Sequence, residues 1–425
     1  MVDHAHPARH DVLVLGAGII GVSTALHLQQ RGLRVCLVDR EAPGSPAAAS
    51  YGNAGLIERA SVVPYAFPRA PLALIRYALN RQPDVRYHLR ALPGAARWLW
   101  TYWRQSATAP LAAAARDMLP LIERSKIEHE ALVRAAGLGD LVRHRGWIDV
   151  YRDPRAFAAA SAEATRLARA HGLSVDVLDG AGLAEREPAL LPRARMAGGI
   201  HWLDPDTVTA PGMLVSGYAD LFRQRGGVLL RADARALRED EHGWLLEGVA
   251  ESAASQAVVA LGADAGALCA SLGYRLPMGI KRGYHMHFRL SSDTPAPAHS
   301  MCDSQAGFVL APMRQGVRLT TGVEFAPEDA PADPTQLRRA EAIARRFWPL
   351  GEPVEAEPWL GRRPCTPDMR PVIGAAPRHR GLWFNFGHAH HGLTLGPVSG
   401  RLLAETMAGE TPFTDPAPYS ARRFL

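Results

Sequence analysis

Three glycines near the start of the chain have the spacing G-x-G-x-x-G, and their surroundings suggest what they could do. Gly16, Gly18 and Gly21 follow an apolar run and open a stretch with helical periodicity. Asp39 lies 18 residues after Gly21, at the end of a second apolar run, 35–38. A strand, a glycine turn, a helix, a strand and an acid in this order are typical of a βαβ unit that binds a dinucleotide.

Each residue of this unit has a physical role in that interpretation. Gly16 permits the sharp turn, Gly18 lets the backbone approach a pyrophosphate, and Gly21 lets the helix pack closely on the sheet. The helix N-terminus faces the phosphates, and Asp39 accepts hydrogen bonds from ribose hydroxyls. The unit alone does not distinguish FAD from a nicotinamide. Its predicted contacts are Gly16, Gly18, Ile19, Ile20, Gly21, Asp39 and Arg40.

Three histidines lie within four positions near the other end of the chain. His388, His390 and His391 belong to the segment GHAHHGLTLGP, which leads into a predicted helix. Imidazoles are common metal ligands, but three of them at one loop-to-helix junction cannot easily converge on one ion. No acidic residue or cysteine adjoins them in the sequence. We therefore predict no metal site.

The composition limits the class of protein. The 425 residues are 47% hydrophobic, which predicts a globular protein of two domains. The net charge is +6, but the 48 basic and 42 acidic residues are interspersed, which argues against nucleic-acid binding. Four separated cysteines without a C-x-x-C pair indicate a reducing compartment. No signal-peptide pattern or membrane-spanning run is visible, so we expect a cytoplasmic protein, with peripheral contact at the inner face of the membrane left open.

The hydrophobic periodicity of the rest of the chain predicts a series of strands and helices that position the glycine turn and the histidine segment. A second strand-to-helix crossing ends at Gly262, and alternation over 280–290 and 317–325 predicts an antiparallel layer. The aromatic stretch 98–105 is read as a helix that covers the core rather than as an interfacial anchor. The segment 359–374 is read as a loop rich in Pro, Arg and Gly. The predicted helices cover residues 111–136, 154–170, 212–225 and 335–348, and a further helix begins near His391.

The predicted fold class is therefore α/β, α+β overall. A Rossmann-like dinucleotide-binding domain is discontinuous and comprises residues 1–58, 205–275 and 355–425. A second domain with a mixed or antiparallel sheet comprises residues 59–204 and 276–354 and binds the substrate.

Six segments in this order resemble the FAD-dependent D-amino-acid oxidase superfamily over nearly the whole chain. They are GAGIIG with Asp39, SYGNAG (50–55), VVALGA (258–263), RGYH (282–285), GRRPCTPDMRPVIG (361–374) and GHAHHGLTLGP (387–397). Within the superfamily the chain is most similar to the bacterial D-amino-acid dehydrogenase and D-hydroxyproline dehydrogenase branch. The resemblance implies FAD as the cofactor, bound non-covalently because Cys365 does not match the cysteine that attaches flavin in sarcosine-oxidase relatives.

The resemblance also implies further cofactor contacts. In the family the SYGNAG loop runs beneath the isoalloxazine ring, and the segment at Gly387 places a helix N-terminus near the pyrimidine edge. Reduced flavin carries negative charge at that edge, which a helix N-terminus stabilises. The implied contacts are Ser50, Asn53, Ala54, Gly55, Leu56, Gly262, Gly392, Leu393 and Thr394.

Three residues are implied to act on the substrate. A planar guanidinium binds a carboxylate well, and the arginine of the family's G-x-R-P loop corresponds to Arg363, with Arg362 as the alternative. Tyr284 would lie against the substrate with His285 on the opposite face of the strand, unless both side chains simply pack. His390 would hold the substrate carboxylate or a ring hydroxyl.

The implied reaction is oxidative deamination of a D-amino acid or a cyclic imino acid of the D-proline or D-hydroxyproline type. A hydride passes from Cα to flavin N5, and the electrons leave to oxygen, a quinone or a carrier protein. Two alternatives stay open. One is a glycine- or sarcosine-type secondary-amine oxidase that produces hydrogen peroxide. The other is a flavin subunit that is active only within a heteromeric dehydrogenase.

Overall fold

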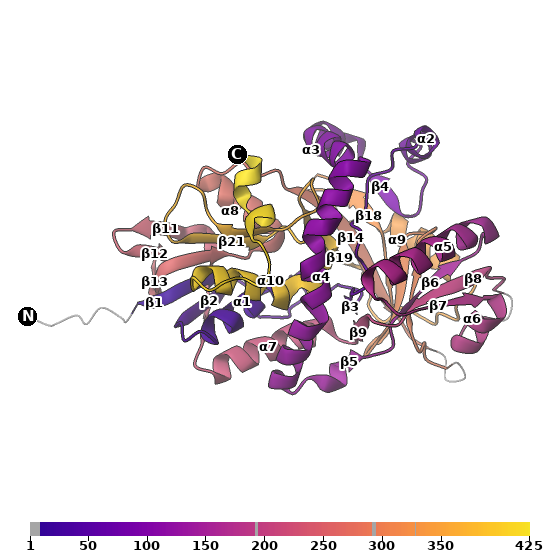
Figure 1. Ribbon diagram of the computed structural model, residues 1–425, viewed down its shortest axis with the longest axis horizontal. Helices are drawn as coiled ribbons and strands as arrows, with labels where there is room; N and C mark the ends of the chain where they lie inside the picture. The colour runs from indigo at the N-terminus through magenta and orange to yellow at the C-terminus, as the bar shows by residue number, and fades with distance from the viewer. Residues whose placement is uncertain (1–8, 192–193, 291–294, 328) are drawn as a thin grey trace, which may run out of the picture.

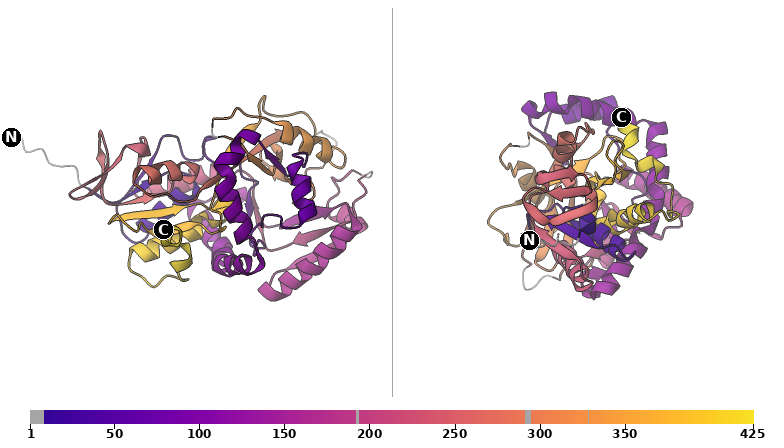
Figure 2. Two further views of the ribbon diagram at one scale, coloured as in Figure 1. Left: turned by 90° about the horizontal axis from the view of Figure 1, so that it is seen from above. Right: turned by 90° about the vertical axis from the view of Figure 1, so that its left-hand side faces the viewer.

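The computed structural model describes residues 9–191, 194–290, 295–327 and 329–425, which form two large sheets with helices packed around them (Figure 1). The views in Figure 2 show the first and last segments of the chain together in one half of the molecule. The long helix α4 (Thr108–Ala136) packs against helices of that half.

The first sheet has eight strands and carries the predicted βαβ unit. Its parallel strands run in the order β10, β2, β1, β13 and β21, and the antiparallel strands β11, β12 and β20 extend it. Val12 and Val14 pack into one core, whereas Leu13 and Leu15 pack into another, so β1 is buried on both faces. The strands are β1 (His10–Leu15), β2 (Val35–Asp39), β10 (Val228–Arg231), β11 (Leu237–Asp240), β12 (Gly243–Leu246), β13 (Val249–Val259), β20 (Val372–Ala375) and β21 (Leu382–Phe386).

Three helices cover one face of this sheet. The N-terminal helix α1 (Ile19–Gln29) packs along α10 (Gly392–Met407) and α7 (Pro211–Gln224). In α10, a Cβ at Gly400 would lie within 3.0 Å of the backbone of α1, so the two helices approach through this glycine. The first and last parts of the chain thus build one nucleotide-binding layer. The short α8 (Ala265–Ser271) follows β13.

The second sheet has ten strands and is mostly antiparallel. Its order is β4, β18, β14, β17, β16, β15, β6, β8 and β7, and β19 pairs with β14. The strands are β4 (Val85–Tyr87), β6 (Trp147–Tyr151), β7 (Val175–Asp179), β8 (Gly198–Trp202), β14 (Gly279–Phe288), β15 (Ser300–Asp303), β16 (Phe308–Met313), β17 (Gly316–Thr320), β18 (Val323–Phe325) and β19 (Trp359–Cys365). Around it lie α2 (Pro71–Ala78), α3 (Leu92–Gln105), α5 (Pro154–His171), α6 (Gly180–Arg186) and α9 (Thr335–Ala344).

A small sheet lies between the others and links them. It consists of β3 (Leu56–Ile57), β9 (Asp206–Val208) and β5 (Val142–Arg143). The predicted mixed α/β fold class is confirmed. The discontinuous two-domain division stays a proposal. The eight-stranded sheet draws its strands from residues 10–39, 228–259 and 372–386.

One predicted element is wrong. The segment 359–374, read as a loop, contains strand β19 and most of strand β20, joined by a shorter loop. Proline content suggested a loop because proline cannot donate to a sheet ladder. Pro364 is nevertheless tolerated because β14 is the only strand that pairs with β19 in the described structure, and the other side of β19 has a bridge at Cys365, to His388, and none at Pro364.

The aromatic stretch 98–105 is mixed in character. In α3, Trp98 and Tyr102 are buried, as expected of a helix that covers the core, but Trp100 is 59% exposed. Among the described residues, none of the helices combines the length and apolar content needed to cross a membrane.

Candidate functional site

One large cavity runs from the glycine turn of the first sheet to the β14–β19 pair of the second. Its volume is about 1240 Å³, above the range of roughly 300–1,000 Å³ typical of sites for small ligands. Gly16 and Gly18 line one end, and Lys281, Arg363 and His390 line the other. The cavity therefore has room for a dinucleotide and a second small molecule.

The glycine turn is shaped by close backbone approach. Gly16 has a φ of +104°, and a Cβ there would lie 2.5 Å from the carbonyl oxygen of Ala260. A Cβ at Gly21 would lie 1.7 Å from the carbonyl oxygen of Gly16. Neither position can carry a side chain without moving the backbone, so the glycine spacing is required by the turn itself.

Polar groups fix the turn against its surroundings. The Asp39 carboxylate accepts a hydrogen bond of 2.6 Å from the Ala17 amide, and Ser50 Oγ accepts one of 3.1 Å from the Ile19 amide. Gly18, the N-cap of α1, supplies no side chain, so the positive end of the helix opens toward the cavity. This arrangement is suited to bind phosphate groups.

Most of the predicted cofactor contacts line this cavity. They are Gly16, Gly18, Ile19, Ile20, Asp39, Arg40, Ser50, Asn53, Ala54, Leu56, Gly262, Gly392 and Leu393. Gly21, Gly55 and Thr394 are not among the lining residues. Gly55 has a φ of +80° and lies against Val208, while the Thr394 hydroxyl donates to Leu56 O and accepts from Glu58 N. These three residues shape the walls of the cavity from behind.

The antiparallel pair of strands β14 and β19 forms the other end of the cavity. Lys281 lies directly opposite Arg363, Gly283 opposite Gly361, and His285 opposite Trp359. Residues directly opposite each other in an antiparallel pair share a face. We call this set of residues the cavity face of the β14–β19 pair.

Arg363 occupies space that Gly283 leaves free. A Cβ at Gly283 would lie 2.4 Å from Nη1 of Arg363. The guanidinium donates to the carbonyl oxygens of Gly322 at 2.7 Å and Thr321 at 3.2 Å, and burial lowers its pKa. Two backbone acceptors thus orient the cation, and its remaining N–H groups are available to a ligand.

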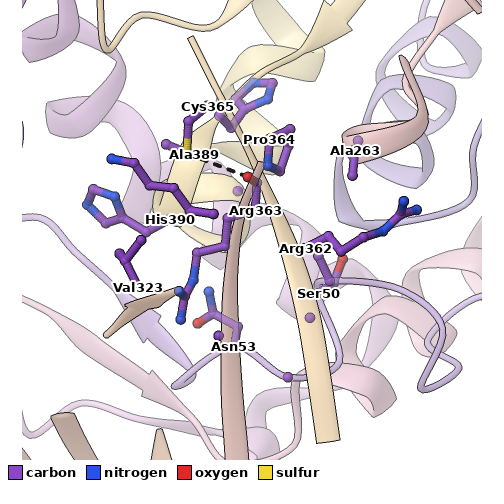
Figure 3. Close-up of a pocket in the computed structure, with 18 of the residues that line it drawn as sticks. Ser50, Asn53, Ala263, Val323, Arg362, Arg363, Pro364, Cys365, Ala389 and His390 are labelled. Carbon is purple, nitrogen blue, oxygen red and sulfur yellow. Dashed lines mark hydrogen bonds between the residues drawn. The ribbon is translucent and has the colours of Figure 1, made fainter. Parts of the chain in front are cut away.

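Arg362 and Arg363 point to opposite sides of β19 (Figure 3). Arg362 forms an ion pair with Asp264, at the start of the helical segment after β13. Of the two arginines considered for carboxylate binding, Arg363 shares its end of the cavity with His390.

Tyr284 does not reach the cavity, which corrects its expected position. Its side chain is 1% exposed, packs into the core of the second sheet, and donates to Glu324 at 2.9 Å. By strand alternation it is His285 that faces the other way, within 4.8 Å of the Trp359 ring. Tyr284 is therefore not retained among the proposed substrate-binding residues.

The histidine segment lies at the wall of the cavity. His388 and His390 are lining residues, and their Nε2 atoms are buried without a hydrogen-bond partner in the described part of the chain. Burial lowers the pKa of His388 to about 3, and burial with the nearby charges of His391, Lys281 and Arg363 lowers the pKa of His390 well below its usual range. Both imidazoles are neutral near pH 7, so His390 can hydrogen-bond to a ligand but carries no positive charge there.

The argument against a metal site considered only the residues that adjoin the histidines in the sequence. Glu58, more than 300 residues away in sequence, approaches His391 with 3.4 Å between Oε2 and Nε2. Glu58, His390 and His391 together could hold an ion by the spacing of their ligand atoms. An acidic residue therefore does approach the histidines, from the position directly after β3 and not from their own segment. The absence of a metal site stays a prediction.

The cavity fits a flavin dinucleotide on its own chemistry. The glycine turn has no room for side chains, and two helix N-termini, of α1 and α10, meet the cavity with N-cap residues whose side chains form no capping hydrogen bond in the described structure. The unpaired imidazole nitrogens of His388 and His390 supply polar groups to a ligand. A large ligand with phosphates at one end and polar ring edges at the other matches this donor set.

Comparison with known proteins agrees with this description. The model of the family of FAD dependent oxidoreductases (DAO) matches residues 11–406, so the chain belongs to this family and is a flavoprotein enzyme that uses FAD. The chain is 30% identical to a D-amino-acid oxidase from Bradyrhizobium diazoefficiens, over 99% of this chain and 100% of that one. It is 31% identical to a D-amino acid dehydrogenase from Cereibacter sphaeroides, over 97% of this chain and 95% of that one. The superfamily prediction is confirmed.

The fold is also shared with solved structures. The crystal structure of glycine oxidase from Geobacillus kaustophilus superposes with a TM-score of 0.75 at 23% identity, over 98% of this chain and 99% of that one. An iminodiacetate oxidase from Chelativorans superposes with a TM-score of 0.70 at 21% identity, over 96% and 98%. At these identities the likeness shows the fold alone.

Two residues of the site were missed from the sequence. Lys281 and Trp359 both line the cavity. Lys281 is one of only two lysines in a chain with 46 arginines, which was a visible signal. Trp359 was hidden because its segment was read as a loop, so its pairing with β14 was not foreseen.

Proposed function

We propose that this flavoprotein catalyses the oxidative deamination of a D-amino acid at Cα. The observation that carries the proposal is that Arg363 lies in the same cavity as the glycine turn, where its oriented guanidinium can bind a carboxylate. The names of the curated relatives support an amino acid of D configuration. When bound, FAD supplies a two-electron acceptor for the hydride that leaves the substrate.

Arg363 positions the substrate in this proposal. The carbonyl oxygens of Thr321 and Gly322 hold the guanidinium in one orientation, so little side-chain entropy is lost when a carboxylate binds. A carboxylate fixed at this point sets the direction of Cα within the cavity, and such positioning is a large source of rate.

The cations around the cavity also act on the substrate amine. Lys281 and Arg363 lie directly opposite each other on β14 and β19, and both line this end of the cavity. The same charges disfavour an ammonium group and favour a neutral amine, whose lone pair is needed as hydride leaves Cα. His390 Nε2, which lacks a hydrogen-bond partner among the described residues, can hydrogen-bond to the bound substrate.

We further propose a peripheral contact of the α2–α3 segment with an anionic membrane, where a quinone could accept the electrons. Residues 59–116 contain nine arginines and one acid, Asp84. Such a combination of apolar and basic side chains is typical of interfacial binding. The exposed apolar side chains of this segment are Val63, Tyr65, Leu72, Ile75, Leu79, Leu89 and Trp100.

Sedimentation with lipid vesicles tests this contact. The protein is expected to sediment with vesicles that contain phosphatidylglycerol and to stay in solution with pure phosphatidylcholine. Leu72→Asp combined with Ile75→Asp should abolish the binding, because both side chains are exposed on α2. Equal binding of the variant and the wild type would contradict the contact.

We also propose a reducing, cytoplasmic location, which the four free cysteines support.

Anaerobic bleaching of the bound flavin tests the proposed reaction. A panel of D- and L-amino acids, glycine, sarcosine and D-proline is mixed with the holoenzyme without oxygen. We expect loss of the oxidised flavin absorbance with D-amino acids and not with their L-enantiomers. Bleaching by L-amino acids alone, by sarcosine alone, or by no compound of the panel would contradict the proposal.

A further inference from the structure

The cavity face of the β14–β19 pair brings two positive side chains directly opposite each other. Lys281 on β14 is the cross-strand partner of Arg363 on β19. Side chains in such a position have Cβ atoms roughly 4.5–5.5 Å apart, and like charges there are destabilising. Both residues line the cavity. An unfavourable pair is therefore held at the place where the ligand binds.

The ammonium of Lys281 is held by aromatic rings. Its Nζ lies 4.2 Å from the centre of the Tyr102 ring and 5.4 Å from that of Trp98, whose own position depends on Gly279. Ring faces orient a cation without neutralising its charge. Within the described ranges the Lys281 ammonium forms neither a hydrogen bond nor an ion pair, and its contacts are with the two rings. The other lysine, Lys126, pairs with Asp206 at 3.1 Å.

The acidic residues at this end of the cavity have partners of their own. Glu58 accepts from Ser61 and faces His391, and Asp303 forms an ion pair with Arg152. Asp84 accepts a hydrogen bond from Tyr77. None of these carboxylates neutralises the Lys281–Arg363 pair. Two cations in a partly buried cavity thus lack an anion in the part of the protein that the structure describes.

In the neighbouring cross-strand pair of the same two strands, each positive side chain is neutralised by a carboxylate. Arg282 lies opposite Arg362, one position along in the register. Arg282 pairs with Glu324 at 2.9 Å, and Arg362 pairs with Asp264. The chain supplies a carboxylate to each member of this pair. Since it supplies none to Lys281 and Arg363, the missing negative charge is expected to come from the ligand.

We propose that Lys281 and Arg363 form a subsite for two anionic groups, so that the substrate carries a second carboxylate or comparable anion besides its α-carboxylate. This inference rests on the proposed function, and it narrows the substrate class to D-amino acids that carry a second anion on the side chain or on an N-linked carboxyalkyl group. Arg363 binds the α-carboxylate, for which its planar fork is suited. Lys281 binds the second anion as a point charge, with Tyr102 and Trp98 holding the ammonium in place.

Paired substrates test the subsite without the need to know the natural one. The value of kcat/KM is measured for D-glutamate against D-glutamine, D-aspartate against D-asparagine, and N-carboxymethylglycine against sarcosine. Each pair differs by one negative charge. The wild-type enzyme is expected to prefer at least one acidic member by roughly 10- to 100-fold, as for a charge-assisted hydrogen bond in a partly buried site. Which acidic member is preferred distinguishes a side-chain carboxylate from an N-linked one.

Variants at Lys281 assign this preference to its charge. Lys281→Met should lower kcat/KM for the acidic member by a larger factor than for the neutral member and so remove the preference, whereas Lys281→Arg should keep the preference. Lys126→Met is the matched control and should leave the ratio unchanged. Flavin content and circular dichroism identify any variant that fails to fold. If Lys281→Met does not fold, the ratio is measured for Lys281→Arg, and loss of the preference in this variant would contradict the role of the charge.

The inference and the proposed function fail in different ways. A wild-type enzyme that oxidises D-glutamine as well as D-glutamate, and D-asparagine as well as D-aspartate, with no preference for N-carboxymethylglycine, overturns the subsite alone. A Lys281→Met variant that lowers activity toward acidic and neutral substrates by the same factor also overturns it. An enzyme whose flavin no D-amino acid bleaches overturns the proposed function itself.

Discussion

The two faces of the β14–β19 pair carry similar numbers of basic side chains but treat their charges differently. On the face away from the substrate, Arg282 and Arg362 each have a carboxylate partner. On the cavity face, Arg363 is bound only to backbone carbonyls and Lys281 only to ring faces within the described structure. The same strands therefore use paired charge to stabilise the fold and unpaired charge to bind a ligand.

This difference has an energetic reason. A buried ion pair loses much of its attraction to desolvation, but removal of one partner leaves an uncompensated charge and is costly. On the cavity face an unpaired charge is less destabilising, because solvent can enter the cavity and hydrate it when no ligand is bound. Arg282 on the other face has no such access, since its partner Glu324 is 0% exposed, whereas Arg362 and Asp264 are partly exposed.

The largest effect is expected from loss of the charge on the packed face. Glu324→Gln keeps the shape of the side chain but leaves Arg282 without its carboxylate and weakens the contact with His88. The free energy of unfolding should fall by about 3–5 kcal/mol, as measured for broken buried pairs. Urea unfolding of the holoenzyme measures the change.

A surface ion pair is the control for this variant. Glu341→Gln breaks the pair of Glu341 with Arg345 on α9, which is partly exposed, and should change stability by less than about 0.5 kcal/mol. If Glu324→Gln is no more destabilising than Glu341→Gln, the carboxylate of Glu324 does not stabilise the fold by neutralising Arg282, which would contradict the proposed difference between the two faces.

A smaller effect is expected from crowding of the cavity face. Gly283→Ala places a methyl group 2.4 Å from the present position of Arg363 Nη1. The guanidinium is the flexible end of its side chain, so it moves and the fold survives. A misplaced carboxylate anchor should lower kcat/KM by roughly 30- to 100-fold with little change in the unfolding midpoint.

Gly94→Ala is the matched control, because a Cβ at Gly94 meets no other atom within 4 Å and the residue lies in helix α3. It should leave kcat/KM unchanged. Full activity of Gly283→Ala would show that the position of Arg363 does not matter for the reaction.

The smallest of the three effects concerns pH. Burial, with the nearby charge of Arg318, lowers the pKa of His285 on the cavity face to about 2. The unfolded chain therefore binds a proton at His285 below about pH 6.5 while the folded chain does not, so acid destabilises the fold. Between pH 6.5 and pH 5 the contribution of this residue to stability should fall by about 2 kcal/mol.

Unfolding free energies of wild type and His285→Gln across this pH range test the effect. The variant should show a shallower decline with acid, whatever its absolute stability. Parallel curves for the two proteins would mean that His285 titrates normally in the folded state.

The sequence predicted the two ends of the cavity unequally well. The glycine turn was predicted residue by residue, because its backbone geometry permits so few side chains that the spacing alone identifies it. Arg363 was predicted through the G-x-R-P pattern of the family. The structure adds the physical reason, which is the space at Gly283.

The error at Tyr284 arose because the sequence did not show which side chains of its strand point to which face. Both Tyr284 and His285 are buried, so burial does not tell which of them lies on the same face of β14 as Lys281 and Gly283. Only the pairing of β14 with β19 fixes the alternation, and the segment of β19 was read as a loop. The approach of Glu58 to His391 depends on β3, which is far away in sequence, so no local pattern could show it.

The most direct test of the account compares Arg363→Gln with Arg362→Gln in the rate of anaerobic flavin reduction. The dependence of that rate on the concentration of a D-amino acid gives an apparent Kd for each enzyme. The account predicts that Arg363→Gln weakens the apparent Kd by roughly 100-fold or more, as for loss of a charge-assisted bidentate contact, and that Arg362→Gln stays within about threefold of wild type. An unchanged apparent Kd in Arg363→Gln, or the larger effect in Arg362→Gln, would contradict it.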